Sequence, residues 1–326
     1  MLMLAALIEK GKLILNEMEI PAPHYGEVLI HVHYAGVNRA DLFQVEGKYP
    51  LPEATFMIPG MEVAGEVAAL GEGVTGLKVG DRVAALTGGG GYAEYAVAHA
   101  EQTFLLSDKH AYRDMTALPE ALLTYWLAMV EKAHLHEGET VLIHAGASGV
   151  GSIGIQMARE LGAHVIATAG GAEKCAYLQS IGADAIDYTK EDVLARIDEI
   201  NRGRKVDVVI DVLGGDYLAK NMKCLRSGGR MVSLAFLDGP KTSDSLGMML
   251  TKNLTWYGAT LGAQSHFAKA DMFQKIRQSL WPAVEAGRIK PRIDAVFPLE
   301  EVEKAHFRMR ERLHIGKIIL EMPVTR

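Results

Sequence analysis

A glycine-rich segment at residues 146–154 carries the clearest chemical signal in this sequence. Within it, Gly149, Gly151 and Gly154 have the spacing G-x-G-x-x-G, after a short apolar run and before a stretch with helical periodicity. Side chains at these glycines would block the tight turn, the approach of a pyrophosphate and the contact between helix and strand. The helix N-terminus would add free N–H groups and the positive end of its dipole. We therefore predict a dinucleotide site, with a glycine turn that serves only packing as the alternative.

The second predicted strand of this region, 164–169, indicates which dinucleotide binds. NAD sites place an acidic residue at the end of that strand, about 20 residues beyond the glycines. Here Gly170 and Gly171 follow Ala169, and the absence of a carboxylate permits the 2′-phosphate of NADP. Lys174, in the first turn of the next helix, offers a countercharge, and Tyr188, after the following strand, offers a hydroxyl.

Plainer interpretations of the same side chains exist. Lys174 is otherwise a solvated lysine, and Tyr188 is otherwise a half-buried packing residue. Glu173 is the competing residue, since it would serve the ribose of NAD. We favour NADPH because Glu173 should already lie on the helix instead of at the strand end.

The order of the predicted elements places the glycine segment inside an α/β domain. From about residue 122, short apolar runs alternate with helical segments, a pattern that forms a parallel, doubly wound sheet. Before that point, strand-like runs follow one another through glycine turns such as 71–73 and 88–91, which is typical of an antiparallel unit. We expect residues 122–261 to form a nucleotide-binding domain inserted into a β-rich domain made of 1–121 and 262–326.

Composition excludes several classes of protein. The 326 residues suffice for two domains, and a net charge of −6 argues against a nucleic-acid surface, which is usually basic. The apolar stretch 121–130 is about half the length that spans a bilayer. Residues 1–8 lack the basic segment and cleavage site of a signal peptide. We expect a cytoplasmic protein without a membrane partner.

The sequence also resembles the medium-chain dehydrogenase/reductase superfamily over essentially its whole length. Residues 59–67, Pro-Gly-Met-Glu-Val-Ala-Gly-Glu-Val, are similar to the G-H-E-x-x-G stretch of that family, and residues 79–83 to its V-G-D-x-V turn. Residues 36–42 and the run Gly-Lys-Tyr-Pro at 47–50 look like the quinone oxidoreductase branch, closest to the tumour-suppressor-inducible group, with zeta-crystallin more distant. The resemblance implies a Rossmann NADP-binding domain at 122–261, inserted into a GroES-like catalytic domain.

The zinc ligands of the alcohol dehydrogenases in that superfamily have no counterparts here. Met61 stands where the catalytic histidine would be, and residues 38–41 replace the region of the first cysteine. The only cysteines are Cys175 and Cys224, both in the other domain. A structural zinc needs four nitrogen or sulfur ligands and a catalytic zinc three protein ligands. We expect no metal.

By position, the resemblance assigns cofactor residues. It matches Ser148, Gly149, Val150 and Gly151 to the pyrophosphate loop, and Gly170, Gly171, Lys174 and Tyr188 to the 2′-phosphate site. The other residues that it implies for the cofactor are Asn38, Thr124, Leu213, Phe236, Leu237, Thr260, Leu261 and Lys317. Lys317 is otherwise an exposed lysine at a strand edge. The resemblance also implies a homodimer or homotetramer joined through the nucleotide domain.

Without zinc, no Lewis acid polarises the substrate, so the acceptor should take a hydride readily, as quinones and conjugated enones do. The cofactor carries the chemistry and the protein aligns the acceptor. Asn38 and Tyr49 are the predicted catalytic residues, because both can donate a hydrogen bond to the acceptor oxygen where negative charge develops. Tyr49 either relays a proton or only forms a wall of the cleft, and Asn38 either holds the acceptor or orients the cofactor.

We therefore predict an NADPH-dependent quinone oxidoreductase. The first alternative is a reductase of enoyl thioesters or other α,β-unsaturated carbonyls on the same fold, although no basic cluster marks a phosphopantetheine site. The second alternative is an NADPH-binding or RNA-binding protein without catalysis. The complete phosphate loop favours an enzyme, and the acidic balance disfavours RNA.

Overall fold

A computed structural model describes residues 1–49, 57–242 and 246–323, so Pro50 of the 47–50 motif lies outside the described residues. The chain divides into two compact units. The first, here called the β-rich unit, comprises Met1–Glu120, Ser265–Arg277 and Pro291–Arg326. The second, the nucleotide unit, comprises Ala121–Gln264 and Gln278–Lys290. Residues 121, 262–264 and 278–290, which were predicted in the β-rich domain, group with the nucleotide unit.

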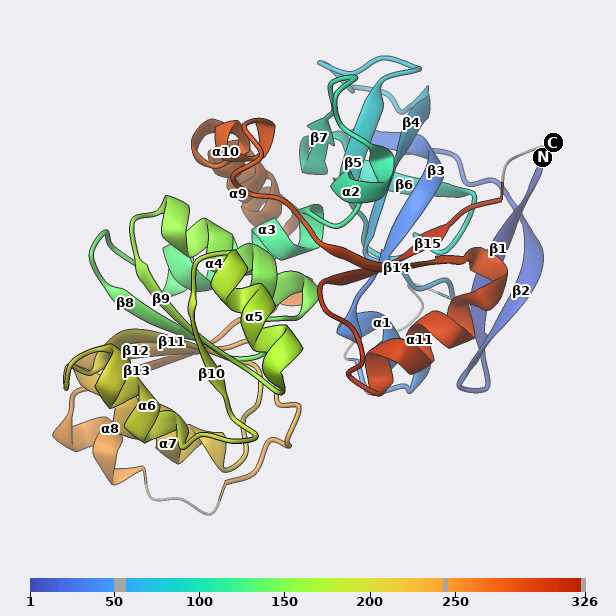
Figure 1. Ribbon diagram of the computed structural model, residues 1–326. Coiled ribbons are helices and arrows are strands. Elements are labelled where there is room, and N and C mark those ends of the chain that lie inside the picture. The colour runs from blue at the N-terminus through green and yellow to red at the C-terminus, as the bar shows by residue number, and fades with distance from the viewer. Residues whose placement is uncertain (50–56, 243–245, 324–326) are drawn as a thin grey trace. The chain divides into compact units, whose positions relative to one another are not determined.

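A mostly antiparallel sheet of seven strands organises the β-rich unit (Figure 1). Its order is β14-β15-β3-β4-β5-β7, with β6 also paired to β3, and only the pair β14–β15 is parallel. Val28, Ile30 and Val32 alternate along β3 and are almost completely buried, which is the period of two that a strand packed on a core requires. The strands of this sheet are β3 (Glu27–Val37), β4 (Glu62–Leu70), β5 (Arg82–Leu86), β6 (Tyr95–His99), β7 (Thr103–Leu105), β14 (Ile293–Pro298) and β15 (Lys317–Glu321).

A separate hairpin and several short helices complete this unit. The hairpin pairs β1 (Leu2–Glu9) with β2 (Lys12–Glu19) in antiparallel register. The helices are α1 (Arg39–Val45), α2 (Tyr112–Met115), most of α9 (His266–Ser279) and α11 (Val302–Arg310).

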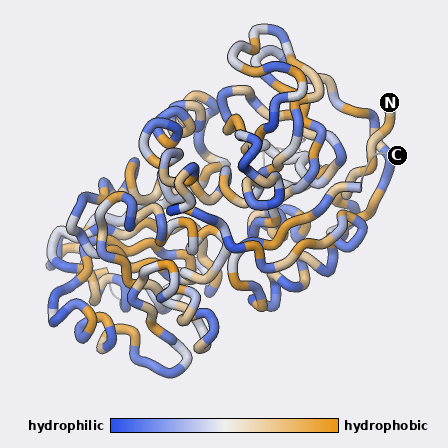
Figure 2. Tube along the Cα trace, turned by 45° about the horizontal axis from the view of Figure 1, so that its top comes forward, coloured by the Kyte–Doolittle hydropathy of each residue, from blue (hydrophilic) through white to orange (hydrophobic). Residues whose placement is uncertain are grey.

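The nucleotide unit is built on six parallel strands in the order β10-β9-β8-β11-β12-β13. The order reverses between β8 and β11, which makes the sheet doubly wound, as the sequence predicts. The three central strands, β8, β9 and β11, are mainly apolar and buried, and Figure 2 shows hydrophobic segments in the interior of this unit. This is expected for a parallel sheet covered on both faces. The strands are β8 (Thr140–Ile143), β9 (His164–Ala169), β10 (Asp184–Asp187), β11 (Val206–Asp211), β12 (Leu225–Ser233) and β13 (Thr255–Gly258).

The unit also contains helices, of which α4 to α8 each connect two consecutive strands of the sheet. The helices are α3 (Pro119–Tyr125), which begins at the unit boundary, α4 (Gly149–Glu160), α5 (Ala172–Ser180), α6 (Val193–Ile200), α7 (Tyr217–Cys224), α8 (Gly247–Thr251) and α10 (Trp281–Glu285). A π-helical segment, Trp126–Lys132, directly continues α3. Among the described residues, no helix combines the length and the apolar character that crossing a membrane requires.

Candidate functional site

The predicted phosphate loop lies between β8 and α4. Ser148 is the N-cap of α4, and its Oγ accepts a hydrogen bond from the Gly151 N–H at 3.0 Å. Gly149 and Val150 occupy the first turn, where backbone N–H groups have no intrahelical acceptor. Such N–H groups at the positive end of a helix dipole form a site for phosphate.

The atoms around two glycines of this loop leave no room for a side chain. A Cβ on Gly151 would lie 2.5 Å from the Ala145 carbonyl oxygen, and one on Gly154 would lie 2.1 Å from the Tyr125 ring. Gly151 therefore permits the tight turn, and Gly154 permits α4 to pack against Tyr125. The backbone stays open for close approach, so the residues present fit a dinucleotide pyrophosphate.

The predicted 2′-phosphate residues gather after β9 and β10. Gly171 is the N-cap of α5 with φ +92°, and Lys174 lies half-buried in the first turns of that helix. A Cβ on Gly170 would lie 2.8 Å from the Tyr188 hydroxyl, so the phenol of Tyr188 lies directly against Gly170. The structure thus brings Gly170, Gly171 and Tyr188 together.

Asp187 is a carboxylate at this position that the sequence analysis missed. It pairs in register with Ala169, and its Oδ1 accepts hydrogen bonds from the Gly171 N–H at 2.9 Å and the Thr189 hydroxyl at 2.6 Å. These hydrogen bonds, first that of the Thr189 side chain, lower the pKa of Asp187. Asp187 therefore holds the Gly170–Gly171 turn as an anion. The spacing rule places the acidic residue at the end of β9, whereas Asp187 lies at the end of β10, one strand further along the chain. The rule therefore does not identify it.

The loops predicted to flank the nicotinamide follow the carboxyl ends of β11, β12 and β13. Carboxyl ends of parallel strands meet at one edge of a sheet, which is the usual ligand edge of doubly wound folds. The Leu237 N–H donates to the Val212 carbonyl at 3.0 Å, and a Cβ on Gly214 would lie 2.5 Å from the Phe236 ring. The first two loops are therefore held against each other. The predicted residues on these loops are Leu213, Phe236, Leu237, Thr260 and Leu261, whereas Thr124 lies on α3.

A buried ion pair holds the predicted catalytic Asn38 in the β-rich unit. Lys317 Nζ lies 2.6 Å from both Asn38 Oδ1 and Glu62 Oε1, and Asn38 Nδ2 donates to Glu62 Oε1 at 3.0 Å. The reverse amide orientation would place the Asn38 NH₂ against the ammonium and its oxygen against the carboxylate. The two charges therefore fix which way the amide points.

The charges of this group are almost completely buried. Lys317 is 2% exposed and Glu62 is 0% exposed, so Lys317 is not the exposed strand-edge lysine of the plainer interpretation. Burial alone would lower the pKa of Lys317, but Glu62 and Glu120 outweigh it and raise the pKa. A Cβ on Gly36 would lie 2.2 Å from Glu62 Oε1, so a glycine on β3 makes room for the carboxylate.

A second buried chain of hydrogen bonds fixes the backbone of Asn38. Asp41 Oδ2 accepts from the Asn38 N–H at 2.7 Å and from the Tyr92 hydroxyl at 2.9 Å. The same hydroxyl lies 3.1 Å from His306 Nε2. Burial raises the pKa of Asp41 to about 7 and lowers that of His306 to about 4. The imidazole is therefore neutral at pH 7.

Tyr49, the other predicted catalytic residue, is half-buried after α1, with its N–H donating to the Phe43 carbonyl at 3.1 Å. Burial raises its pKa, with further contributions from Glu120 and Asp41. The Tyr49 hydroxyl therefore keeps its proton at neutral pH and can act as a donor. Asp41 and Glu120 also act on Asn38 and Lys317, so Tyr49 lies within the electrostatic range of the charged residues that hold Asn38.

Asn38 and Lys317 were predicted from the sequence, whereas Glu62, Asp41 and Tyr92 were not. A signal for Glu62 existed, because this carboxylate lies in an apolar strand and buried carboxylates require a partner. Met61, which precedes Glu62 in the chain, stands at the position of the zinc-binding histidine of the alcohol dehydrogenases. The described part of the chain contains no group of three or more His, Cys, Asp or Glu side chains placed to hold a metal ion.

Comparison with known proteins agrees with this architecture. Residues 24–108 match the alcohol dehydrogenase GroES-like domain, and residues 149–276 match the zinc-binding dehydrogenase domain. A quinone oxidoreductase of Pseudomonas aeruginosa is 34% identical over 92% of this chain and 92% of its own length.

Solved structures share the whole fold. The quinone oxidoreductase of Pseudomonas syringae superposes with a TM-score of 0.86 at 31% identity, over 98% of this chain and 100% of the other. A mycobacterial protein solved in complex with NADPH superposes with a TM-score of 0.87 at 29% identity, over 98% and 99% of the two chains. The predicted GroES-like and Rossmann folds are confirmed, and the chain belongs to the quinone oxidoreductase branch of the medium-chain dehydrogenase/reductase superfamily.

Proposed function

We propose that this chain is an NADPH-dependent reductase of quinones and related conjugated carbonyls. Its membership of the quinone oxidoreductase branch supports reductase chemistry, and the relative solved with NADPH supports the cofactor. The observation that carries the proposal is the buried Lys317–Glu62 pair, which orients the amide of Asn38. NADPH, when bound, supplies the hydride.

Asn38 is the proposed donor to the acceptor oxygen. One N–H of its amide donates to Glu62, which leaves the second N–H for the substrate. The Lys317 ammonium at Oδ1 polarises the amide, and in a buried setting such polarisation strengthens the N–H donor. A donor that is fixed before the reaction stabilises developing negative charge without reorganisation. Tyr49, which keeps its proton at neutral pH, is the proposed second donor.

The nucleotide unit supplies the proposed NADPH residues. Ser148, Gly149, Val150 and Gly151 would hold the pyrophosphate, and Lys174 with Tyr188 would hold the 2′-phosphate. Asp187 is anionic nearby, but its Oδ1 is occupied by donors of the turn that it stabilises. Because the sequence lacks counterparts of the family's zinc ligands, we propose that the acceptor is activated by hydrogen bonds alone.

A homodimer through the nucleotide unit is also proposed. In the part of the chain that the structure describes, β13 pairs only with β12 and forms an edge of the parallel sheet. Trp256 on this strand is 37% exposed, and Leu250 on α8, the helix that precedes β13, is 82% exposed. An unprotected edge with apolar neighbours is a typical surface for strand pairing with a second copy.

A panel of acceptors, each assayed with NADPH and with NADH, tests the proposed activity. We expect quinones and enones to be reduced with NADPH at a higher kcat/KM than with NADH. Faster turnover of an enoyl-CoA than of any quinone would instead identify an enoyl-thioester reductase. If NADPH binds but no quinone, enone or enoyl thioester oxidises it, the chain is not a reductase of this class.

A further inference from the structure

A cavity of about 620 Å³ lies within the β-rich unit. The hairpin β1–β2, the glycine turn at 88–90, β6 and α9 contribute to its lining, whereas Asn38, Tyr49 and Lys317 do not. Small-molecule sites typically measure roughly 300–1,000 Å³. The cavity is therefore large enough for a ligand and is separate from the residues proposed for catalysis.

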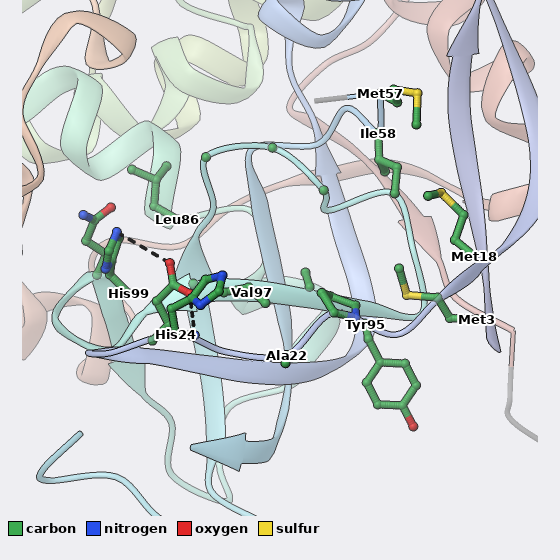
Figure 3. Close-up of a pocket in the computed structure, with 18 of the residues that line it drawn as sticks. Met3, Met18, Ala22, His24, Met57, Ile58, Leu86, Tyr95, Val97 and His99 are labelled. Carbon is green, nitrogen blue, oxygen red and sulfur yellow. Dashed lines mark hydrogen bonds and ion pairs between the residues drawn. The ribbon is translucent and has the colours of Figure 1, made fainter. Parts of the chain in front are cut away.

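Figure 3 shows that the two ends of this cavity differ chemically. Met3, Met18 and Ile58 lie at one end, and His24 and His99 lie at the other. Methionine side chains are flexible and polarisable, so they adapt to apolar ligands of varied shape. This arrangement fits an elongated molecule with an apolar chain and a polar head.

The lining contains two carboxylates: Glu19, which is exposed on β2 beside Met18, and Glu27 near the polar end. The carboxylates near the polar end, Glu27 and Glu101, already have partners. Glu27 Oε2 accepts from the His24 N–H at 2.9 Å, and its Oε1 lies 4.0 Å from His99 Nε2. His266 Nε2 lies 3.1 Å from Glu101 Oε2, and His266 Nδ1 lies 2.8 Å from Gln102 Nε2. Because an amide nitrogen only donates, His266 Nδ1 accepts the hydrogen bond from Gln102. The proton of this imidazole is therefore on Nε2, which donates a hydrogen bond to Glu101.

Lys269 on α9 is the cation of this lining without a matching anion. It is half-buried, and within the described ranges its ammonium makes no hydrogen bond and no ion pair. Burial lowers the pKa of Lys269, and no neighbouring carboxylate counteracts this effect. A desolvated charge without a partner is unfavourable, so a bound anionic group would be stabilised here.

We propose that this cavity binds a medium-chain carboxylate, whose carboxylate pairs with Lys269 and whose hydrocarbon chain packs on Met3, Met18 and Ile58. Lys269 acts electrostatically on His99, so the cation lies at the polar end, and the methionines lie at the other. These two ends correspond to the two parts of such a molecule. This binding requires neither NADPH nor an acceptor, so it stands apart from the proposed reductase activity.

Titration of the full chain with decanoate, below its micelle concentration, tests the proposal. With ¹³C-methyl-labelled methionine, we expect saturable shifts of the Met3 and Met18 resonances. Lys269→Gln should raise the decanoate Kd at least about tenfold, because a charge-assisted hydrogen bond is lost. Lys275→Gln, on the same helix but paired with Asp271 at 2.8 Å and outside the lining, should leave the Kd unchanged.

Two further ligands separate the contributions of head and chain. Acetate should bind far more weakly than decanoate, and decan-1-ol should bind weakly to both the native chain and Lys269→Gln. Equal affinity of decanoate for the native chain and Lys269→Gln would overturn the proposal. So would equal affinity of the native chain for decan-1-ol and decanoate, which would show a neutral apolar site, and so would the absence of saturable methionine shifts.

Discussion

At the scale of single residues, charge placed beside an amide determines how Asn38 can act. Lys317 and Glu62 fix both ends of its side chain and leave one N–H for the acceptor. Asn38→Ala should therefore lower kcat by about 10²–10³, the typical effect of removing one donor from a developing oxyanion. The NADPH Kd, measured by fluorescence titration, should change much less.

Asn16→Ala is the matched control, since Asn16 lies on the exposed face of the β1–β2 hairpin. It should leave kcat and the NADPH Kd unchanged. An Asn38→Ala enzyme that keeps its kcat but loses affinity for NADPH would show that Asn38 orients the cofactor and not the acceptor.

Lys174 carries the proposed preference for the 2′-phosphate. Lys174→Ala removes one charge-assisted hydrogen bond, worth about 1.5–3 kcal/mol, so the NADPH KM should rise roughly 10–100-fold. The NADH KM should hardly change, because NADH has no 2′-phosphate. Lys223→Ala, an exposed lysine on α7, serves as the control. Equal effects of Lys174→Ala on both cofactors would remove Lys174 from the 2′-phosphate site.

At the scale of elements, the packing of α4 depends on one missing side chain. Gly154→Ala places a Cβ 2.1 Å from the Tyr125 ring, so α4 must shift. Overpacking of this kind costs about 1–3 kcal/mol. The thermal unfolding temperature should fall, and affinity for NADPH and NADH should fall together, because both share the pyrophosphate.

A compensating variant separates this cause from a general loss of stability. Gly154→Ala with Tyr125→Leu should regain part of the cofactor affinity, since the smaller side chain relieves the clash. Gly258→Ala, where a Cβ would meet nothing within 4 Å, should keep the native unfolding temperature. Failure of Tyr125→Leu to restore any affinity would show that α4 is held by other contacts.

Asp41 on α1 and His306 on α11 both contact the Tyr92 hydroxyl, and their contributions to stability should change with pH in opposite directions. The pKa of Asp41 is raised from 3.8 to about 7, so its contribution to stability is complete below pH 3.8 and is lost as the pH rises to about 7. The pKa of His306 is lowered from 6.5 to about 4, so its contribution is complete above pH 6.5 and is lost as the pH falls to about 4. The two effects oppose each other in the native chain.

Replacing either Asp41 or His306 should expose the pH dependence of stability that the remaining residue causes. Between pH 6.5 and pH 4, Asp41→Asn should lose stability, whereas His306→Gln should gain it. Each pKa unit corresponds to about 1.4 kcal/mol, so either change should amount to roughly 2–4 kcal/mol in denaturant unfolding. Parallel pH curves for the native chain and both variants would contradict these assignments.

Periodicity and spacing predicted those parts of the fold that depend on residues close together in the sequence. The apolar runs and the glycine loop indicated β8, α4 and the doubly wound sheet, because each pattern lies within about 20 residues. The Lys317–Glu62 pair joins strands that are 255 residues apart in the chain, and no local pattern encodes such a contact. Asp187 was missed for the same reason, since only the pairing of β10 with β9 brings it to the Gly171 turn.

At the scale of the whole molecule, the exposed edge of the parallel sheet predicts association. Leu250→Glu places a charge on α8, the helix that precedes β13. It should therefore weaken the proposed dimer and shift the sedimentation of the chain toward monomer in analytical ultracentrifugation. Phe267→Glu is the matched control, because Phe267 is 80% exposed, close to the 82% of Leu250, but lies in the β-rich unit. If both variants dissociate to the same degree, or if only Phe267→Glu dissociates, the interface does not run through β13. A native chain that sediments as a monomer at every concentration would exclude the dimer itself.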